Sequence, residues 1–242
     1  MSVRRNLRQG DEVLICRKRY VLVKRLGGGF QSRTWLARDL DRSGKRHKDN
    51  ECVVKMTKEH RLATSELRAY TYLEKNNFPE RYYSELLAFD NKATAYRRRK
   101  RGGSFYAIVL KKYDGSLRSL MDQLSKEEKK KIAGKIKRRV EKLHKVGMIH
   151  RDLREENILI RKRRKGIGVL LTDFANSVLV TDARKQKVRK LLDSEKERVQ
   201  RIVRRQVSKT HQFNGAHYCL KLDGIRISVV DHLRLSWSGG RV

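Results

Sequence analysis

The sequence predicts an α+β fold with two lobes, the first built on a five-stranded antiparallel sheet and the second mainly helical. Two observations support this prediction. Up to about residue 113 short apolar runs alternate with polar positions, whereas beyond Gly115 apolar residues recur at helical spacing. In addition, no repeat or flexible linker divides the 242 residues, which contain a single proline. We therefore expect one domain over 1–242, with lobes at about 11–113 and about 114–242.

The first lobe is predicted from apolar runs bounded by turn residues and from one helical pattern. Residues 11–40 alternate apolar and polar positions around three glycines, which is typical of two strands joined by a glycine turn. Residues 40–50 are polar and predict a loop, and the basic run 97–101 predicts another. The five expected strands lie at about 20–23, 34–37, 51–56, 82–89 and 104–110, and the expected helix lies at 65–75.

The second lobe is predicted from longer stretches with one apolar face. In the stretch 126–147, Ile132, Ile136, Val140 and Leu143 share one side of a helix. The expected elements are helices at 116–124, 126–147 and 183–208, a hairpin at 158–160 and 167–171, and a further hairpin at 217–230.

The net charge predicts an acidic partner. Lys and Arg total 61 against 27 Asp and Glu, a formal net charge of +34, whereas solubility of a small domain needs only roughly 2–8 charges. Such an excess favours binding to acidic proteins, nucleic acid or an anionic membrane face. The basic runs 97–101 and 161–165 are typical of nucleic-acid contacts or nuclear localisation, and solvated turns are the alternative interpretation.

The cysteines and the hydropathy predict the compartment. Cys16, Cys52 and Cys219 are widely spaced, so neither a disulfide framework nor a cysteine zinc site is indicated. Reduced thiols fit an intracellular location, and no stretch approaches the roughly 18 apolar residues of a membrane span. We expect an intracellular protein, in the nucleus or the cytoplasm, without a membrane span.

The strongest functional signal is His150-Arg151-Asp152-Leu153-Arg154-Glu155-Glu156-Asn157, followed by Leu171-Thr172-Asp173-Phe174-Ala175. This combination resembles the H-R-D-L-x-x-x-N and D-F-G motifs of the eukaryotic protein kinase superfamily. The resemblance implies a protein-kinase-like fold and the use of ATP and Mg²⁺. It further implies that Asp152 is the catalytic base and that Asn157 and Asp173 are the metal ligands.

Two further segments resemble the nucleotide-binding part of this superfamily. Gly27, Gly28 and Gly29 lie where the glycine-rich loop covers the phosphates, since glycine lets backbone amides approach closely. Lys55, at the end of an apolar strand, matches the lysine of the V-A-I-K pattern and needs a partner if it is buried. Glu66 is the expected partner, Glu59 is a rival, and an ordinary surface helix charge is the alternative for Glu66.

The segment 106–117 resembles the hinge between kinase lobes. The resemblance implies that adenine binds backbone groups near Leu110 to Lys112 and that Val109 lies near the gatekeeper position, with a register defined to within one residue. A strand followed by a helix with Ser116 as its N-cap describes the same residues and is compatible with this assignment.

Several positions depart from the family pattern. Ser32 replaces the third glycine, Thr34 stands where valine usually packs on adenine, and Ala175 replaces the glycine of D-F-G. Arg154 occupies the slot of the lysine near the γ-phosphate, and we expect it to act in catalysis. No Ala-Pro-Glu triplet follows, so the resemblance covers roughly residues 18–180. It implies a two-lobed protein-kinase-like fold whose mainly helical second lobe is shortened and is atypical after about residue 180.

The sequence therefore predicts an ATP- and Mg²⁺-dependent protein kinase. Its expected substrate is the hydroxyl of an acidic protein, with Ser/Thr favoured over Tyr. The alternative is a pseudokinase-like basic scaffold that binds nucleic acid or acidic partners. A small-molecule kinase is a weaker third hypothesis, because such enzymes commonly carry His-Gly-Asp where this chain has His150-Arg151-Asp152.

Overall fold

The computed structural model describes residues 7–28, 32–40, 46–97, 100–164, 166–180, 185–206, 218–222 and 225–229. They group into two compact units, one formed by Met1–Leu124 with His150–Ser177 and the other by Ser125–Ile149 with Val178–Val242. The expected lobe boundary near residue 113 stays a prediction, and each unit is described by itself.

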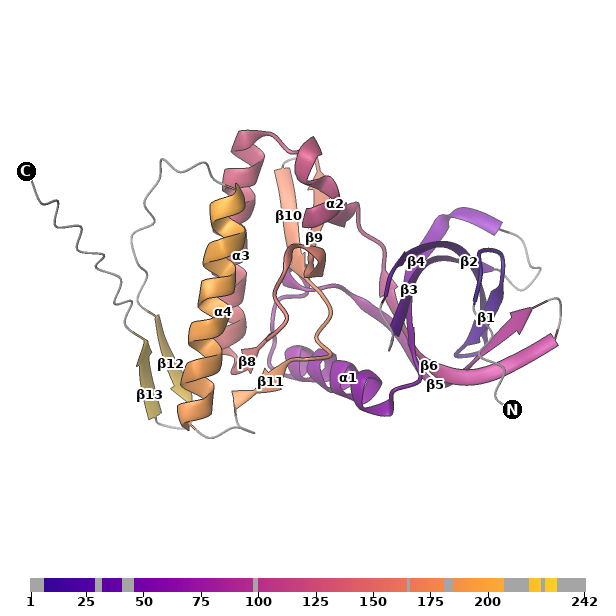
Figure 1. Ribbon diagram of the computed structural model, residues 1–242, viewed down its shortest axis with the longest axis horizontal. Coiled ribbons are helices and arrows are strands. Elements are labelled where there is room, and N and C mark those ends of the chain that lie inside the picture. Colours follow the sequence, from indigo (N-terminus) through magenta and orange to yellow (C-terminus); the bar gives the residue numbers. More distant parts are fainter. Residues whose placement is uncertain are drawn as a thin grey trace, which may run out of the picture. The chain divides into compact units, whose positions relative to one another are not determined.

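The first unit contains a closed antiparallel barrel with the strand order β1-β2-β3-β4-β6-β5 (Figure 1). Its strands are β1 (Glu12–Ile15), β2 (Lys18–Gly27), β3 (Ser32–Leu40), β4 (Arg46–Thr57), β5 (Leu86–Arg97) and β6 (Lys100–Lys111). The sheet has six strands rather than the expected five, because β1 pairs with both β2 and β5. The turn between β1 and β2 contains no glycine. It places Cys16 and Arg17 at φ 46° and 65°, so the sequence carried no conventional turn signal there.

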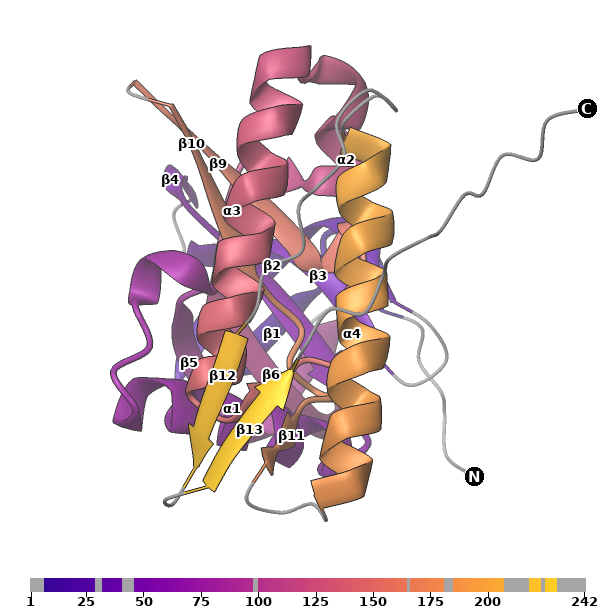
Figure 2. The ribbon, with the colours of Figure 1, turned by 90° about the vertical axis from the view of Figure 1, so that its left-hand side faces the viewer.

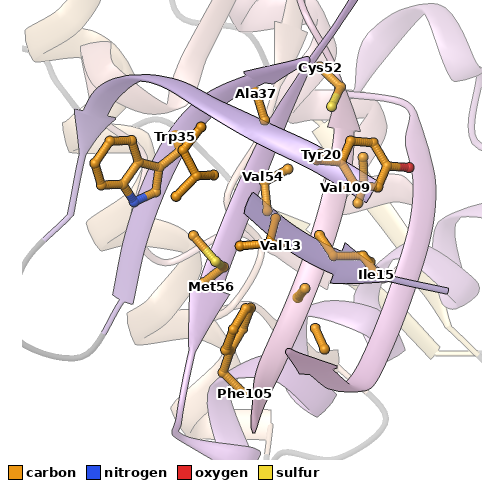
Figure 3. Packing of buried hydrophobic residues seen from close by; sticks show 13 residues of the cluster. Val13, Ile15, Tyr20, Trp35, Ala37, Cys52, Val54, Met56, Phe105 and Val109 are labelled. Carbon is orange, nitrogen blue, oxygen red and sulfur yellow. The ribbon is translucent and has the colours of Figure 1, made fainter. Parts of the chain in front are cut away.

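One face of each barrel strand forms the core. Val13, Trp35, Val54, Met56 and Val109 belong to this cluster and are nearly inaccessible to solvent (Figure 3). Alternation along a strand sends every second side chain to the opposite face. Burying each large side chain contributes roughly 1.5–3 kcal/mol, so the cluster holds β4 and β6 firmly and leaves their other faces for the site.

The expected bounds of two loops, 40–50 and 97–101, were wrong. Residues 46–50 were expected in a loop but belong to β4, where Leu40 pairs with Arg46. Strands β5 and β6 reach Arg97 and Lys100, so the run 97–101 lies at a hairpin end and not in a separate loop; residues 98–99 lie outside the described residues. In both cases cross-strand pairing overrides the poor strand propensity of a polar, charged segment.

Helix α1 (His60–Lys75) begins five residues before the expected start. Its buried face carries Ala63, Glu66, Ala69, Tyr70 and Leu73, a stripe at helical spacing that includes one carboxylate. After α1 the chain forms a short 3₁₀ turn, η1 (Glu80–Tyr82), and Tyr83 then makes a parallel bridge with Leu171. This bridge ties the start of β5 to the segment that precedes Asp173.

The rest of the first unit supports the motif-bearing loop. It consists of β7 (Gly115–Ser116), α2 (Leu117–Leu120), η2 (Met121–Gln123), η3 (Glu155–Asn157), β9 (Ile158–Arg163) and β10 (Gly166–Leu171). Strands β10, β9 and β7 form one sheet, which confirms the expected hairpin. The Ser119 amide donates a hydrogen bond of 3.1 Å to Ser116 Oγ, so Ser116 is the N-cap that the sequence predicted. Lys162, Arg163 and Arg164 are exposed near the hairpin end, and Lys165 lies outside the described residues.

The second unit contains the basic helices α3 (Lys126–Lys145) and α4 (Lys185–Gln206), which lie side by side (Figures 1 and 2). Its strand pairs are β8 (Met148–Ile149) with β11 (Val178–Leu179) and β12 (Tyr218–Leu222) with β13 (Ile225–Val229). Ser125 and Glu128 form a capping box at the start of α3. The expected helices 126–147 and 183–208 and the hairpin 217–230 are thus confirmed over those of their residues that the structure describes. No helix among the described residues is long and apolar enough to cross a membrane.

Candidate functional site

Lys55 is the centre of a three-charge cluster. It lies between Val54 and Met56 on β4, and because those two side chains face the barrel core, Lys55 faces the opposite side. Its Nζ lies 2.6 Å from Glu66 Oε2 and 2.7 Å from Asp173 Oδ1. The structure thus pairs Lys55 with Glu66, which is 1% exposed, and not with the exposed Glu59.

The three charges differ in burial, with Glu66 fully enclosed and Lys55 and Asp173 partly exposed. Burial alone would lower the pKa of Lys55, but the carboxylates of Glu66 and Asp173 outweigh it and raise that pKa. Burial raises the pKa of Glu66 in spite of Lys55. Burial acts in the same direction on Asp173, but Lys55 outweighs it and lowers the pKa of Asp173. The pKa values of the two carboxyl groups therefore shift in opposite directions, because burial outweighs Lys55 at Glu66 whereas Lys55 outweighs burial at Asp173.

The backbone around Asp173 is held by aromatic packing and hydrogen bonds. Phe174 is fully buried, with its ring centroid 5.0 Å from that of His150 and 5.5 Å from that of Tyr70. His150 Nε2 lies 2.9 Å from the carbonyl oxygen of Thr172. Asp173 itself has φ 64°, a conformation that few residues other than glycine adopt. The surrounding contacts therefore fix a strained backbone that directs the Asp173 carboxylate toward Lys55.

Asp152, Asn157 and Arg154 form a second polar group on the motif-bearing loop. Asn157 Nδ2 donates hydrogen bonds to the carbonyl oxygen of Asp152 at 2.8 Å and to its Oδ2 at 3.1 Å. Arg154 Nη2 lies 3.4 Å from the same Oδ2, and the Arg154 side chain is 58% exposed. The Thr172 amide donates to the carbonyl oxygen of Asn157, which connects this group to the Asp173 segment.

A pocket of about 380 Å³ is lined by Asp152 and Arg154 together with the Lys55 cluster, whereas Asn157 is buried beside Asp152 and is not among the lining residues. It is lined by Ser32, Lys55, Thr57, Leu62, Glu66, Ile108, Asp152, Arg154, Asp173, Ala175 and Asn176. Sequence reasoning missed Thr57, Leu62, Ile108 and Asn176 as lining residues. Ile108 could have been found from alternation, because it pairs with Lys55 across β4 and β6 and shares its face.

The expected hinge residues do not line this pocket. Val109 belongs to the barrel core, so the pocket-facing residue is Ile108, one position earlier. Leu110 is buried in β6, and Lys112 Nζ lies 2.6 Å from Glu51 Oε2. Lys112 and Arg38 together lower the pKa of Glu51. The side chains of Val109 and Lys112 are thus committed to packing and to an ion pair, and only backbone groups of this segment remain for a ligand.

Only part of the glycine turn between β2 and β3 lies among the residues that the structure describes. Gly27 ends β2, Gly28 has φ +123°, and Gly29 lies outside the described residues. A Cβ atom on Gly28 would lie 2.3 Å from the carbonyl oxygen of Ser32, whereas one on Gly27 would meet nothing within 4 Å. Gly28 is therefore required by the turn, and Ser32, which follows the turn, lines the pocket.

The oxygen donors of Asp173 and Asn157 fit a magnesium ion. The described residues contain no group of three His, Cys, Asp or Glu side chains that could hold a metal alone. Mg²⁺, however, is commonly bound through one or two protein oxygens, with phosphates and water completing its coordination. A carboxylate and an amide are both hard oxygen donors, so this pair matches that chemistry.

Comparisons with known proteins agree with this geometry. A family model described as the protein kinase domain matches residues 20–196. The serine/threonine-protein kinase PKH1 of Saccharomyces cerevisiae is 30% identical over 165 residues, which cover 66% of this chain and 19% of that protein. The chain thus spans about a fifth of the length of this curated relative.

A solved structure, titled the crystal structure of the BubR1 kinase domain, shares the fold. It matches with a TM-score of 0.63 and 13% identity, over 97% of this chain and 75% of that one. The two-lobed protein-kinase-like fold that the sequence predicted is thereby confirmed. The family match also continues to residue 196, beyond the expected limit near 180 and into α4.

Proposed function

Because the chain belongs to the protein kinase family, we propose that it transfers the γ-phosphoryl group of ATP to a protein hydroxyl in a Mg²⁺-dependent reaction. The observation that carries the proposal is the cluster in which Lys55 bonds to both Glu66 and Asp173 beside Asp152 in one pocket. The similarity to a serine/threonine-protein kinase favours Ser or Thr over Tyr as the acceptor.

Lys55 and Glu66 are proposed to hold the nucleotide phosphates. The Lys55 ammonium group remains charged at neutral pH, because its two carboxylate neighbours raise its pKa. A fixed positive charge in a partly enclosed pocket attracts the phosphates. Glu66 Oε2, 2.6 Å away, prevents Lys55 from adopting other rotamers, which makes the ammonium group a positioned binding group.

Asp152 is proposed to act as the base. In the proposed step the acceptor oxygen forms a bond to the γ-phosphorus, the bond from that phosphorus to the β,γ-bridging oxygen breaks, and ADP leaves. The acceptor proton passes to Asp152 Oδ2, whose orientation is supported by the Asn157 amide. Arg154, beside Asp152 and largely exposed, would stabilise the negative charge of the transferred group.

Asp173 and the amide oxygen of Asn157 are proposed to hold Mg²⁺, which would neutralise charge on the phosphates. The Asp173 carboxylate is ionised at neutral pH because its pKa is lowered by Lys55, which outweighs the effect of burial. Backbone groups near Leu110 and Lys112 are proposed to bind adenine, with Gly27 and Gly28 near the phosphates.

Phosphoryl transfer to acceptor proteins tests the proposal. Wild type, Asp152→Asn and Asp173→Asn would be incubated with γ-labelled ATP, Mg²⁺ and either casein, an acidic acceptor, or histone, a basic one. We expect the two variants to lose at least about 10²-fold in rate and casein to be preferred, because the chain carries a net charge of +34. Asp122→Asn, on exposed η2, is the matched control. Equal incorporation by all four proteins would refute the assignment.

The charge of the second unit supports a second candidate function, a basic scaffold for nucleic acid or acidic proteins. Helix α3 carries ten Lys or Arg against three Glu, and α4 carries nine against three acidic residues. On α3, Lys131, Arg138, Lys142 and Lys145 are exposed. Like charges at i,i+4 destabilise a helix by about 0.2–0.5 kcal/mol per pair, a cost that a bound polyanion would remove.

A salt titration tests the scaffold. Binding of a DNA duplex and of a polyglutamate peptide would be measured from 50 to 300 mM NaCl, with Lys131→Glu/Arg138→Glu as the variant. Charge-driven DNA binding predicts a steep fall in affinity with salt and a shallower slope for the variant. A salt-independent affinity, or equal slopes for both proteins, would remove this candidate.

A further inference from the structure

Three hydroxyl groups form a hydrogen-bonded chain behind the charged cluster. Tyr70 OH lies 2.6 Å from Ser84 Oγ, and Ser84 Oγ donates to Thr172 Oγ1 at 2.9 Å. Tyr70 is 3% exposed and Ser84 is fully buried. These residues come from three different segments, namely α1, the residues before β5 and the residues after β10.

The donor and acceptor in each hydrogen bond of this hydroxyl chain follow from the number of protons that a hydroxyl group carries. A hydroxyl group has one proton to donate and two lone pairs to accept with. Since Ser84 gives its proton to Thr172, the hydroxyl of Tyr70 must donate to Ser84. Burial, followed by the nearby Glu66, raises the pKa of Tyr70 well above its ordinary value, so this donor keeps its proton. Both hydrogen bonds of the hydroxyl chain are therefore donated in the direction from α1 toward the Asp173 segment.

The two end residues of the hydroxyl chain, Tyr70 and Thr172, lie next in the structure to the groups proposed to act on ATP. Tyr70 lies one helical turn after Glu66 on α1, so both side chains share one face of the helix. Thr172 immediately precedes Asp173, and its amide donates to the carbonyl oxygen of Asn157 at 3.1 Å. The backbone of Ser84 adds a further link, since its amide donates to the Leu171 carbonyl at 2.9 Å.

Helix α1 needs such an anchor because of Glu66. This carboxylate is 1% exposed, its Oε2 contacts Lys55, and its Oε1 has no hydrogen-bond partner among the described residues. Burial of an incompletely paired carboxylate is unfavourable. A shift of α1 that returned Glu66 to water would recover hydration energy. The buried hydroxyl chain opposes this shift, because it would leave Ser84 and Tyr70 without partners.

We propose that Tyr70, Ser84 and Thr172 are positioning residues that couple α1 to the Asp173 segment and hold Glu66 and Asp173 on the same lysine. This inference rests on the proposed function for its catalytic consequence, but its structural part stands on the hydrogen bonds alone. The aromatic contact of Tyr70 with Phe174 is a separate link, and removal of the hydroxyl leaves it in place.

The matched pair Tyr70→Phe and Tyr83→Phe tests the coupling. Both rings lie in the same aromatic group, with centroids 6.1 Å apart, but only Tyr70 belongs to the hydroxyl chain. Amide hydrogen exchange of the nucleotide-free protein would be compared between α1 and the barrel strands β2 and β3. We expect Tyr70→Phe and Thr172→Val to lower protection in α1 about five- to tenfold while the barrel is unchanged. Tyr83→Phe should match wild type.

Two further readouts separate coupling from a general loss of stability. The double variant Tyr70→Phe/Thr172→Val should be little worse than either single variant, because the three hydroxyl groups act as one connected hydrogen-bonded group. In phosphoryl transfer, Tyr70→Phe should raise the KM for ATP and lower kcat several-fold, because a displaced α1 would withdraw Glu66 from Lys55, which is proposed to hold the phosphates, whereas Tyr83→Phe should keep both wild-type values.

The outcomes are distinguishable. If wild type transfers no phosphoryl group, the proposed function fails, while the exchange measurement still decides the coupling. If Tyr70→Phe exchanges like Tyr83→Phe, or if α1 and the barrel lose protection together, the positioning role is refuted even in an active kinase. Additive losses in the double variant would also refute a connected chain.

Discussion

At the scale of single residues, the charge state of the site depends on one lysine shared by two carboxylates. Lys55 and Glu66 are eleven positions apart and could be paired from the sequence, whereas Lys55 and Asp173 are 118 positions apart. The sequence motifs identified Lys55 and Asp173 separately. Nothing in either motif indicates that the two side chains form a hydrogen bond in the absence of a ligand. The opposite pKa shifts of Glu66 and Asp173 follow from their unequal burial, which only the folded chain defines.

The lowered pKa of Asp173 predicts how its contribution to stability varies with pH. Burial acts to raise this pKa, but Lys55 outweighs it, so the folded value lies below the ordinary value of 3.8. The ionised carboxylate therefore stabilises the folded protein above pH about 4, and this contribution is lost as the pH falls through the folded pKa. At pH 7 we expect Asp173→Asn to lower the free energy of unfolding by about 1.5–3 kcal/mol, the range for a hydrogen bond to a charged group.

Thermal unfolding of wild type and Asp173→Asn between pH 7 and pH 3 checks this prediction. The difference in Tm between the two proteins should narrow toward the acidic end. Asp122→Asn, which removes an exposed carboxylate, should keep the wild-type Tm at pH 7. A gap that stays constant down to pH 3 would show that the carboxylate charge does not stabilise this cluster.

At the scale of elements, alternation along the strands decides which residues reach the pocket. On β6 the side chain of Val109 packs in the barrel and that of Ile108 faces the pocket. A one-residue change of register reverses every side chain of a strand. A sequence pattern that is uncertain by one residue therefore identifies the strand without identifying its pocket face. Strand β1 was missed for a related reason, since its four residues gain stability only by closing the barrel.

The turn between β2 and β3 allows a comparison of two adjacent glycines. Gly28 has φ +123° and no space for a Cβ atom, whereas Gly27 has open space. We expect Gly28→Ala to displace the turn and weaken ATP binding about tenfold or more, and Gly27→Ala to bind ATP nearly as wild type does. Titration of each variant with Mg·ATP, followed by thermal shift, measures the difference. Equal affinities of the two variants would mean that the turn does not contribute to nucleotide binding.

At the scale of the whole molecule, the charge of +34 predicts a marked effect of salt on stability. Repulsion among like charges destabilises a compact state, and salt screens charges over about 10 Å at 0.1 M and 3 Å at 1 M. We expect the Tm to rise by several degrees between 20 mM and 500 mM NaCl. Sucrose at the same osmolality is the control for non-ionic effects. A Tm that falls or stays level with salt would indicate that compensating ion pairs outweigh the repulsion.

The sequence by itself determined the family, the order of most elements and the identity of the reactive groups, because these depend on local periodicity and on residues at short, characteristic spacings. Only the tertiary structure decided that the sheet closes into a six-stranded barrel, that Ile108 rather than Val109 faces the pocket, and that Lys55 bonds to two carboxylates. The hydroxyl chain through Tyr70, Ser84 and Thr172 belongs to this second group as well. The physical reason is that strand register, burial and long-range hydrogen bonds are properties of segments packed together, and no segment carries them alone.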